Sequence, residues 1–507
     1  MLQGIGAGVG RALIPASMIG PAAALGSDNY EDGLTRASPG EANVDSGAVL
    51  DYIDTLFAHE LDLHGFMLYR HGNVVAEGWS WPYAAHRPHM MHSLTKSVTT
   101  CAVGLAIDEG RFTLDDRVVD FFPDEAPETI NTNLAAMTVR DLLTMQSGHA
   151  ESVSGSVFRP IKTSWVAEFF KIPVVHAPGS HFLYSSAVSF MLSAIVTRTT
   201  GQAVRDYLEP RMFAPLGIAG ISWGGSPNGI SSGGNGLTWR TADSLKLGIL
   251  HLNRGEWDDK QVLPSDWVDA ATRPQVPARN YGYQWWVHEA ASAYFAVGAF
   301  GQYSIVFPQH DAVLALTAGV QRSASLREHA WEYFPDAFLG STSSAANQTQ
   351  RQLDARLRDM RLLPEARQTT STIAAAVSGK PYAIAANDDD VSSVQLDFNG
   401  NDVTFRLTDH RGVHSVRAGL DRWIESETSI TGNKLHHQYQ ADDMRVVAHG
   451  RWWDEHTFEM TWQFVETAWV DTVTVRFFDD RISIDRRTNA NYAPRVATTL
   501  RGIALEA

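Results

Sequence analysis

Residues 93–110 of this sequence read SLTKSVTTCAVGLAIDEG. Apolar residues recur in it at helical spacing, at Val98, Cys101 and Leu105. Such spacing is typical of a helix with one buried face, and a glycine after the last apolar turn commonly ends a helix. We therefore expect an apolar helix that starts at Ser93 and stops at Gly110.

The first four residues of that stretch, Ser93-Leu94-Thr95-Lys96, form an S-x-x-K motif. Residues three apart share one face of a helix, so the amine of Lys96 can reach the hydroxyl of Ser93. Serine is a weak nucleophile until a neighbouring base takes its proton, and a lysine desolvated near a helix N-terminus can be neutral and act as that base. The motif alone also fits an exposed lysine on a capped helix, so its function depends on further elements.

Two later segments carry residues that suit the same chemistry. Tyr184-Ser185-Ser186 lies directly before a second apolar helix, which passes through Val188 and stops at Gly201. A tyrosine there can relay a proton to a leaving group, with a pKa lowered by the neighbouring lysine. Residues 296–302 read AVGAFGQ and enter a strand, where glycines can direct a backbone N–H at an oxyanion. Each segment alone also has a purely structural interpretation: Tyr184 as a half-buried aromatic residue, and residues 296–302 as a tight turn.

The composition of the 507-residue chain excludes several classes of protein. With 44% hydrophobic and 19% charged residues, most of the chain is globular. Its 57 acidic and 41 basic residues give a net charge of −16, which argues against nucleic acid or an anionic membrane as partner. A single cysteine, Cys101, excludes an intrachain disulfide. No apolar run reaches about 18 residues, so we expect no integral membrane association.

Residues 1–44 are expected to form a leader. Arg11 precedes a short apolar run at residues 12–19, and Ala22-Ala23-Ala24 resembles the cleavage site of a secretory signal. Pro15 and the many glycines of the first ten residues argue against a working signal peptide. The sequence therefore favours the cytoplasm and leaves the periplasm open.

The remaining chain divides into three parts. Residues 45–340 alternate helical and strand patterns, which predicts an α+β fold with an antiparallel sheet flanked by helices. Residues 341–370 hold a linker helix. Residues 371–507 alternate apolar and polar positions in short segments, which predicts an additional C-terminal antiparallel β domain. Its tryptophans are interpreted as core and face-covering residues: Trp423, Trp452, Trp453, Trp462 and Trp469.

Local signals place further elements within residues 45–340. Turn residues at His71-Gly72-Asn73 predict a hairpin over residues 66–76, and residues 308–311 predict a second one over residues 305–316. Thr138-Val139-Arg140-Asp141 is a capping box, and we expect it to open a helix over residues 141–145.

Taken in order, the S-x-x-K, Tyr-Ser-Ser and glycine motifs resemble those of the serine β-lactamase and penicillin-binding-protein superfamily. The likeness is closest to its class C-like branch of esterases, amidases, peptidases and 6-aminohexanoate-oligomer hydrolases, and extends over about residues 50–335. Other stretches agree in the same order: MTVRDLLTMQSG (137–148), PGSHFLYSS (178–186), GLTWRTADSLKLG (236–248) and YGYQWW (281–286).

The resemblance implies a β-lactamase-like fold, in which the antiparallel sheet and its helices meet an all-helical subdomain. It implies that Ser93 is a nucleophile that forms an acyl-enzyme, that Lys96 is its general base and that Tyr184 is the proton relay. No metal or organic cofactor is implied. The implied partner is a small-molecule or short-peptide substrate, and self-association is left open.

The resemblance also makes Ser186 and Gly298 substrate-binding residues, and the backbone N–H groups of Ser93 and Ala299 an oxyanion hole. Two positions depart from the drug-hydrolysing pattern. Ser186 stands where class C β-lactamases and many penicillin-binding proteins have Asn, and Ala296-Val297-Gly298 lacks the Lys-Thr pair that binds a substrate carboxylate. Both departures argue against β-lactam hydrolysis. The Tyr-Ser-Ser motif together with the Gly-x-x-Gly-Gln strand is instead similar to the motifs of the oligoamide hydrolase and esterase branch.

Several other motifs are set aside. Residues 229–233 match the nucleophile-elbow pattern G-x-S-x-G, but they lie in a glycine-rich stretch without the required strand and helix, so we expect a loop near the site. Ser27-Asp28-Asn29 and Lys162-Thr163-Ser164 resemble family motifs in the wrong order. Cys101 is interpreted as a small buried residue.

The histidines are not interpreted as metal ligands. His86, His89 and His92 recur every third residue, but Pro88 interrupts any helix that would align them. We expect His92 or His89 to line the pocket instead. The adjacent pair His436-His437 is interpreted as structural.

The sequence therefore predicts a serine hydrolase that cleaves an amide, peptide-like or ester bond. The alternatives are a carboxylesterase for small acyl esters, a peptidase for linear peptides (including linearised non-ribosomal ones), a catalytically silent binding protein and a β-lactam-recognising carboxypeptidase.

Overall fold

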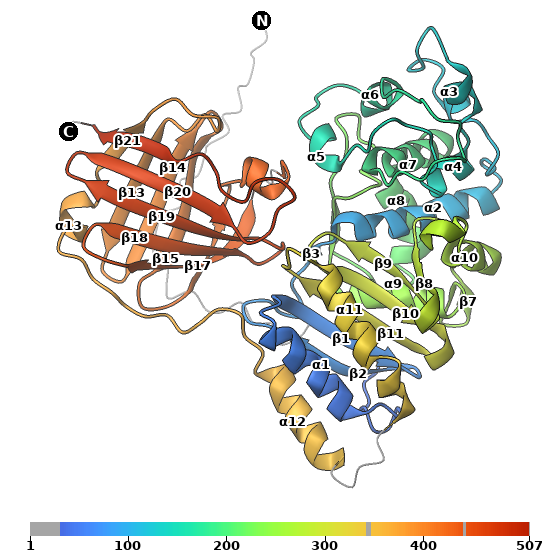
Figure 1. Ribbon diagram of the computed structural model, residues 1–507, viewed down its shortest axis with the longest axis horizontal. Helices are drawn as coiled ribbons and strands as arrows, with labels where there is room; N and C mark the ends of the chain where they lie inside the picture. Colours follow the sequence, from blue (N-terminus) through green and yellow to red (C-terminus); the bar gives the residue numbers. More distant parts are fainter. Residues whose placement is uncertain (1–30, 341–345, 440–442, 506–507) are drawn as a thin grey trace, which may run out of the picture.

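The computed structural model describes residues 31–340, 346–439 and 443–505. Residues 1–30, with most of the expected leader and Ser27-Asp28-Asn29, lie outside the described residues. The described chain forms a helix-covered sheet, a helical part beside it and a C-terminal closed sheet (Figure 1). This is the mixed α+β architecture predicted from the sequence.

The first sheet is antiparallel and, in the described part of the chain, has the six-stranded order β2-β1-β11-β10-β9-β8. Its strands are β1 (Leu63–Arg70), β2 (Asn73–Trp79), β8 (Trp286–His288), β9 (Ala293–Gly298), β10 (Gln302–Phe307) and β11 (Ala312–Ala318). Both predicted hairpins are confirmed, since β1 pairs with β2 and β10 pairs with β11. The pairing of β1 with β11 joins the two ends of this part of the chain.

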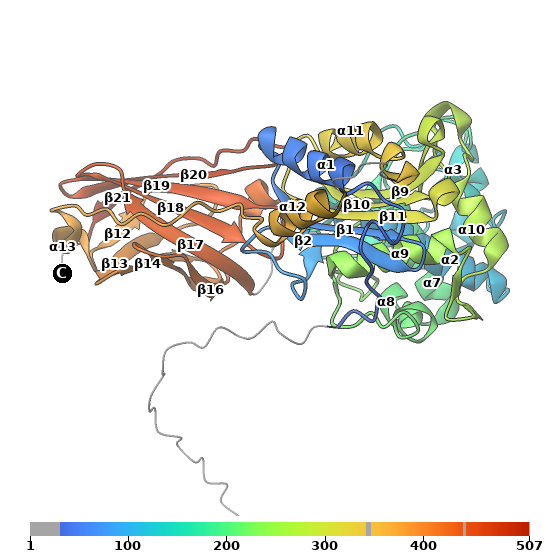
Figure 2. The same ribbon diagram turned by 90° about the horizontal axis from the view of Figure 1, so that it is seen from below.

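The central strands feed two separate cores, because neighbouring residues of a strand point to opposite faces. Phe66 and Leu68 of β1 pack with residues of α1, α11 and α12, whereas Met67 and Tyr69 belong to the core that holds α2 and α9. The covering helices are α1 (Ser46–Ala58), α11 (Ala324–Tyr333) and α12 (Ala346–Arg358) on one face, with α2 (Thr95–Asp108) and α9 (Thr241–Leu252) on the other. Figure 2 shows these layers.

The helical part packs around α7, whose apolar side chains are buried and which ends at Gly201 with φ 75°, as predicted. Its helices are α3 (Thr132–Ala136), α4 (Val139–Leu143), α5 (Gly155–Phe158), α6 (Trp165–Phe170), α7 (Ser186–Thr200) and α8 (Val204–Leu208). The helix α10 (Ser265–Thr272) lies apart from them and packs on α2, where Trp267 Nε1 donates to Thr100 O at 3.1 Å. The capping box of Thr138 and Asp141 is present, but α4 starts two residues earlier than the expected helix because Thr138 itself is the N-cap. Three short strands connect this part to the rest: β3 (His89–Met90), β4 (Ser222–Trp223) and β5 (Leu237–Trp239).

The C-terminal part is a second antiparallel sheet that closes on itself. Within the described residues it has ten strands, and β15 at one end also pairs with β17 near the other, at Gly419 and His449. The strands are β12 (Pro381–Ile384), β13 (Ser393–Asn399), β14 (Asp402–Asp409), β15 (Gly412–Gly419), β16 (Ile424–Thr428), β17 (Met444–Trp452), β18 (Thr457–Phe464), β19 (Val470–Phe478), β20 (Arg481–Thr488) and β21 (Leu500–Ala504). Trp452, Trp462 and Trp469 are buried in its core, as expected, whereas Trp453 is exposed.

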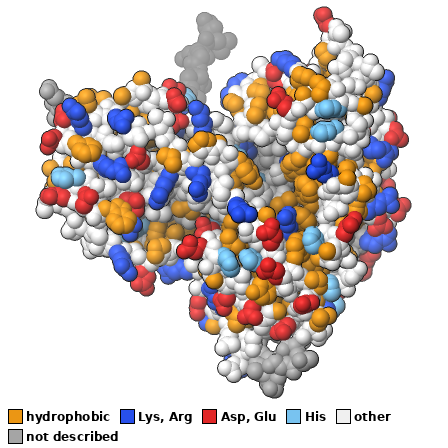
Figure 3. All heavy atoms as spheres, in the orientation of Figure 1, with side chains coloured by type: hydrophobic (Ala, Val, Ile, Leu, Met, Phe, Trp, Pro, Cys, Tyr) orange, Lys and Arg blue, Asp and Glu red, His pale blue; other side chains and the backbone are white. Residues whose placement is uncertain are grey.

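The closed sheet is bonded to the segment that leads into the S-x-x-K motif. Met90 N donates to Glu466 O at 2.8 Å, and Tyr83 Oη donates to Thr467 O at 2.9 Å. Met90 itself is buried in the core of the closed sheet. The surface of the molecule is hollowed between the closed sheet and the helical part (Figure 3). Of the helices described, none is long and apolar enough to cross a membrane.

Candidate active site

Ser93 lies on a single 3-10 turn, η1 (His92–Leu94), that runs directly into α2. His92 has φ 48°, a left-handed conformation that strains a non-glycine residue and turns the chain sharply before the helix. The carbonyl of His92 accepts a hydrogen bond from Thr95 Oγ1 at 2.6 Å, which holds this turn. The α-helix therefore begins two residues after the expected start. Ser93 stands at its N-terminal entrance, where the helix dipole favours a developing anion.

Lys96 extends from the first turn of α2 and is buried. Its Nζ donates to Ser93 Oγ at 3.0 Å, to Ser186 Oγ at 3.1 Å and to the carbonyl oxygen of Gly234 at 2.7 Å. Burial disfavours the charged ammonium and lowers the pKa of Lys96 from 10.5 to about 7. Near neutral pH, a large fraction of this amine is therefore unprotonated and next to a serine hydroxyl.

Tyr184 lies two residues before Ser186, the first residue of α7, so both side chains reach the same amine. Its ring centroid is 4.8 Å from Lys96 Nζ, and the ring of Trp286 packs beside it at 5.8 Å. Burial raises the pKa of Tyr184, although a hydrogen bond with Ser93 acts in the opposite direction. The expectation of a lowered pKa is therefore wrong, because desolvation outweighs the neighbouring groups.

A glycine-rich loop holds Lys96 from the side opposite Ser93. A Cβ atom on Gly233 would lie 2.2 Å from the carbonyl oxygen of Ser189, and one on Gly234 would lie 2.7 Å from that of Ser186. Only residues without a Cβ can pack this closely against α7. The loop can then present the carbonyl of Gly234 to the lysine amine.

The end of β9 forms the wall beside Ser93. A Cβ atom on Gly298 would lie 2.0 Å from the carbonyl oxygen of Met91, so only glycine lets this strand approach the turn that carries Ser93. The carbonyl of Ala299 accepts a hydrogen bond from Gln302 Nε2 at 3.0 Å, which fixes the backbone after β9. Ser93, Gly298 and Ala299 all line one pocket.

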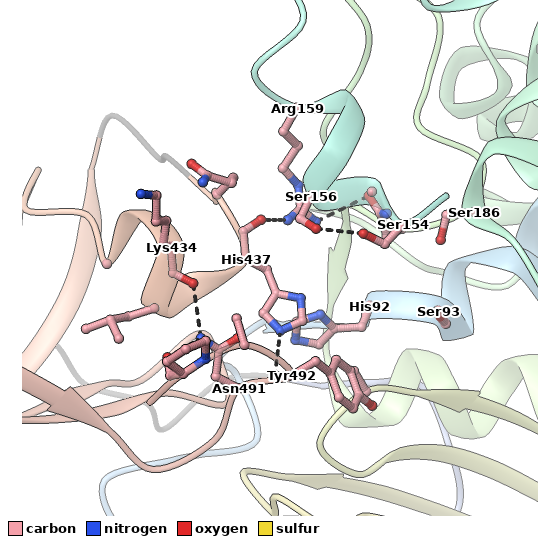
Figure 4. A pocket seen from close by; sticks show the side chains of 18 of the residues that line it. His92, Ser93, Ser154, Ser156, Arg159, Ser186, Lys434, His437, Asn491 and Tyr492 are labelled. Atoms are coloured by element: carbon pink, nitrogen blue, oxygen red, sulfur yellow. Dashed lines mark hydrogen bonds between the residues drawn. The ribbon is translucent and has the colours of Figure 1, made fainter. Parts of the chain in front are cut away.

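That pocket has a volume of about 890 Å³ and lies between the helical part and the closed sheet. The sequence-predicted residues in its wall are Ser93, Tyr184, Ser186, Gly298 and Ala299, with Lys96 bonded behind Ser93 and Ser186. Figure 4 shows Ser93, Ser186 and Arg159 on one side, and His437, Lys434 and Asn491 on the other. The structure therefore brings all the expected residues together and adds a wall from the C-terminal sheet.

The residues of this additional wall were not predicted from the sequence. Residues 432–438, which include η8 (Asn433–His436), and residues 491–498 supply most of it. Of the pair interpreted as structural, His436 is buried and His437, just after a 3-10 turn, lines the pocket. Arg159, Asn235 and Tyr492 also line it. Some of these residues are separated by hundreds of positions in the sequence, and no local motif identifies them.

The other candidate residues have separate places. His92 lines the pocket, whereas the buried ring of His89 contacts His64, with 3.0 Å between Nε2 and Nδ1. Ser231, the serine of the G-x-S-x-G pattern, is buried, and its Oγ accepts a hydrogen bond from the backbone N–H of Arg205 at 3.3 Å. Cys101 is buried, as expected.

Comparisons with known proteins agree with this geometry. The profile of the family described as Beta-lactamase matches residues 53–334, more than half of the chain. The 6-aminohexanoate-dimer hydrolase of Paenarthrobacter ureafaciens is 23% identical over 279 residues, which cover 49% of this chain and 70% of that protein. Protein Rv1367c of Mycobacterium tuberculosis is 29% identical over 147 residues, which are 25% of this chain and 36% of that protein. The match thus spans about a third of this second relative.

A solved structure has a similar fold over both parts of the chain. The crystal structure of SurE superposes with a TM-score of 0.50 and 18% sequence identity, and covers 92% of this chain and 100% of that one. This likeness concerns the fold alone. The family profile, together with the S-x-x-K turn beside β9, leads to one conclusion: the chain belongs to the beta-lactamase family.

Proposed function

We propose that this protein is a serine hydrolase that cleaves an amide, peptide-like or ester bond through an acyl-enzyme on Ser93. One observation carries the proposal: the buried amine of Lys96, with a pKa of about 7, lies 3.0 Å from Ser93 Oγ. A neutral amine there can accept the serine proton, while its two N–H groups donate to Gly234 O and Ser186 Oγ.

In the acylation step, Ser93 Oγ attacks the substrate carbonyl carbon and its proton moves to Lys96 Nζ. The backbone N–H groups of Ser93 and Ala299 stabilise the oxyanion, and the helix dipole of α2 adds to this effect. Tyr184 passes a proton from Lys96 to the leaving alcohol or amine as its bond to the carbonyl breaks. Its raised pKa keeps the phenol protonated at neutral pH and therefore able to donate.

Deacylation reverses the roles. A water molecule gives a proton to the neutral amine and attacks the acyl carbon, and Ser93 Oγ leaves with that proton. Gly298 and Ser186 line the substrate-binding part of the pocket in this proposal. A relative named for a dimer of 6-aminohexanoate, whose units are joined by an amide bond, supports an amide or peptide-like substrate over a simple ester.

The test compares wild type and Ser93→Ala in steady-state assays with 4-nitrophenyl acyl esters, the matching 4-nitroanilides, short linear peptides and nitrocefin. We expect Ser93→Ala to lose at least about 10³-fold in kcat on each substrate that the wild type cleaves. Ser231→Ala is the matched control, because it removes the serine of the competing motif and is expected to keep full activity. Full activity in Ser93→Ala would overturn the proposal.

The ratio of peptide to ester turnover in the wild type then decides between a peptidase and an esterase. A catalytically silent binding protein would show no turnover above background in either form.

A further inference from the structure

Arg159 is a charged residue of the pocket that no motif accounts for. It directly follows α5 and is half-buried, and it lines the same cavity as Ser93. Its Nη1 donates to the backbone carbonyl of His437, and its Nη2 lies 3.4 Å from Asn235 Oδ1 (Figure 4). Both partners are neutral. Within the described chain, no carboxylate forms an ion pair with this guanidinium.

The other charged groups in the wall are already engaged with each other or with the closed sheet. They are Lys434, Asp388 and Asp389. Lys434 Nζ lies 3.9 Å from Asp388 Oδ2, and Asp389 Oδ1 accepts a hydrogen bond from Asn433 Nδ2 at 2.7 Å. Of the two cations in the described wall of the pocket, Arg159 is therefore the one without a counter-ion, since Lys434 lies beside Asp388.

The neighbouring histidines do not add positive charge. Burial first, and then the nearby charge of Arg159, lower the pKa of His437 to about 4. Burial also lowers the pKa of His92 well below its usual value. Both rings are neutral near pH 7, so Arg159 has no cationic competitor among them for an anionic ligand.

Close packing ties Arg159 to the nucleophile. A Cβ atom on Gly155 would lie 1.8 Å from Asn235 Nδ2, so glycine at the start of α5 lets the amide reach this turn. Asn235 contacts the guanidinium, and its neighbour Gly234 accepts the hydrogen bond of Lys96. Arg159 thus contacts the residue next to Gly234, whose carbonyl positions the amine of Lys96.

We propose that Arg159 is a specificity-determining residue that binds a carboxylate of the substrate. This inference rests on the proposed hydrolase function and names its substrate class: amides or esters that carry a free carboxylate away from the scissile carbonyl. Guanidinium has five N–H donors in a planar fork that matches a carboxylate, and the hydrogen bonds to His437 and Asn235 use two of them. Ala296-Val297, on the strand beside Ser93, supplies no cation for this purpose.

The test uses two pairs of substrates that differ in one charge. Mono-4-nitrophenyl suberate and its methyl ester place the charge, or its absence, on the acyl part. 4-Acetoxybenzoate and 4-acetoxybenzamide place it on the leaving group. We expect Arg159→Gln to lower kcat/KM by about 10- to 100-fold for at least one charged substrate, mainly through KM, and to change its neutral partner by less than about twofold. The pair that responds identifies the side on which the carboxylate lies.

Two further variants complete the design. Arg159→Lys keeps the charge but loses the fork, so we expect an intermediate loss, and it replaces Arg159→Gln if that variant fails to fold. Arg117→Gln is the charge-matched control, because Arg117 is an exposed arginine paired with Asp120. Equal losses on charged and neutral substrates, or no loss on either charged substrate, would overturn the inference. If Ser93→Ala still abolishes turnover of the neutral esters in that case, the hydrolase proposal survives and only the carboxylate site fails.

Discussion

Gly298 and the carbonyl oxygen of Met91 approach each other so closely that a Cβ atom on Gly298 would lie 2.0 Å from that oxygen. We predict that Gly298→Ala separates the end of β9 from the Ser93 turn, lowers the free energy of unfolding by about 1–3 kcal/mol and sharply lowers kcat. Thermal melting and ester turnover measure the two effects. Gly40→Ala is the control, since a Cβ there meets nothing within 4 Å. Wild-type kcat in Gly298→Ala would show that this contact does not position the site.

The low pKa of Lys96 predicts the pH dependence of acylation. The neutral amine is the active form, so kcat/KM on a neutral ester should fall about tenfold per unit below pH 7 and reach a plateau above it. The pocket histidine His437, with a pKa of about 4, titrates below this range. A pH–rate profile measures this, with Lys96→Arg expected to be inactive because arginine stays protonated. A profile that is flat from about pH 6 to 8 would contradict the role of Lys96.

Tyr184→Phe separates two kinds of leaving group. An amine leaves only when protonated, whereas 4-nitrophenolate leaves as the anion, so loss of the phenol should affect amides far more than activated esters. We expect kcat to fall about 10²-fold or more on a 4-nitroanilide and clearly less on the matching 4-nitrophenyl ester. The phenylalanine keeps the ring contact with Trp286, at 5.8 Å in the wild type. Equal losses on the two substrates would argue for a positioning role only.

Asp471 predicts an acid-sensitive closed sheet. It is buried, and its Oδ1 lies 2.9 Å from His436 Nε2 while its Oδ2 pairs with Arg486 at 2.5 Å. Burial alone would raise the pKa of Asp471, but Arg486 and His436 lower it to about 2. A lowered folded-state pKa gives stability that is present above the ordinary value of 3.8 and lost as pH falls toward 2. Thermal melting between these pH values should show this loss.

Substitution of Asp471 checks the same pair at neutral pH. Asp471→Asn should cost about 3–5 kcal/mol of unfolding free energy, because it leaves the charge of Arg486 without its partner. Asp480→Asn, at an exposed pair 3.8 Å from Arg481, should cost less than about 1 kcal/mol. Equal effects of the two substitutions would mean that the buried pair contributes no more to the free energy of unfolding than the exposed one.

Tyr492 tests the wall that the closed sheet supplies. Its side chain is 68% exposed and stacks on Phe300 with 5.2 Å between ring centroids. Tyr492→Ala should therefore leave the melting temperature nearly unchanged but raise KM for extended substrates several-fold. Trp453→Ala is the control, an exposed aromatic of the same sheet that is not part of the pocket wall. Unchanged KM values across short and long substrates would mean that this wall does not contact them.

The sequence predicted those parts of the site that depend on local spacing. Ser93 and Lys96 are three residues apart on one turn, so their contact follows from short-range geometry. The hairpins and the alternating C-terminal strands follow in the same way, from side chains that alternate between faces. Ser186 reaches Lys96 across 90 positions, and only the resemblance to a known family placed it and Tyr184 in the site. The division at residues 45–340 and 371–507 stays a prediction, which limited proteolysis can test.

Long-range packing decided what the sequence missed. Arg159 meets the backbone of His437 across 278 positions, and nothing in either segment marks the other. The pKa of Tyr184 was predicted in the wrong direction because burial, which the sequence does not reveal, outweighs its hydrogen bond with Ser93. The pair His436-His437 was interpreted as structural, and long-range packing of the closed sheet places His437 in the pocket wall.

Covalent labelling tests directly whether Ser93 is the nucleophile. The wild type and Ser93→Ala are incubated with a fluorophosphonate probe near pH 8, digested and mapped by mass spectrometry. We predict one adduct, on the peptide that contains Ser93, which is absent in Ser93→Ala and lost in the wild type at about pH 5, where Lys96 is protonated. An adduct on another serine, or a wild type that does not react at either pH, would contradict it.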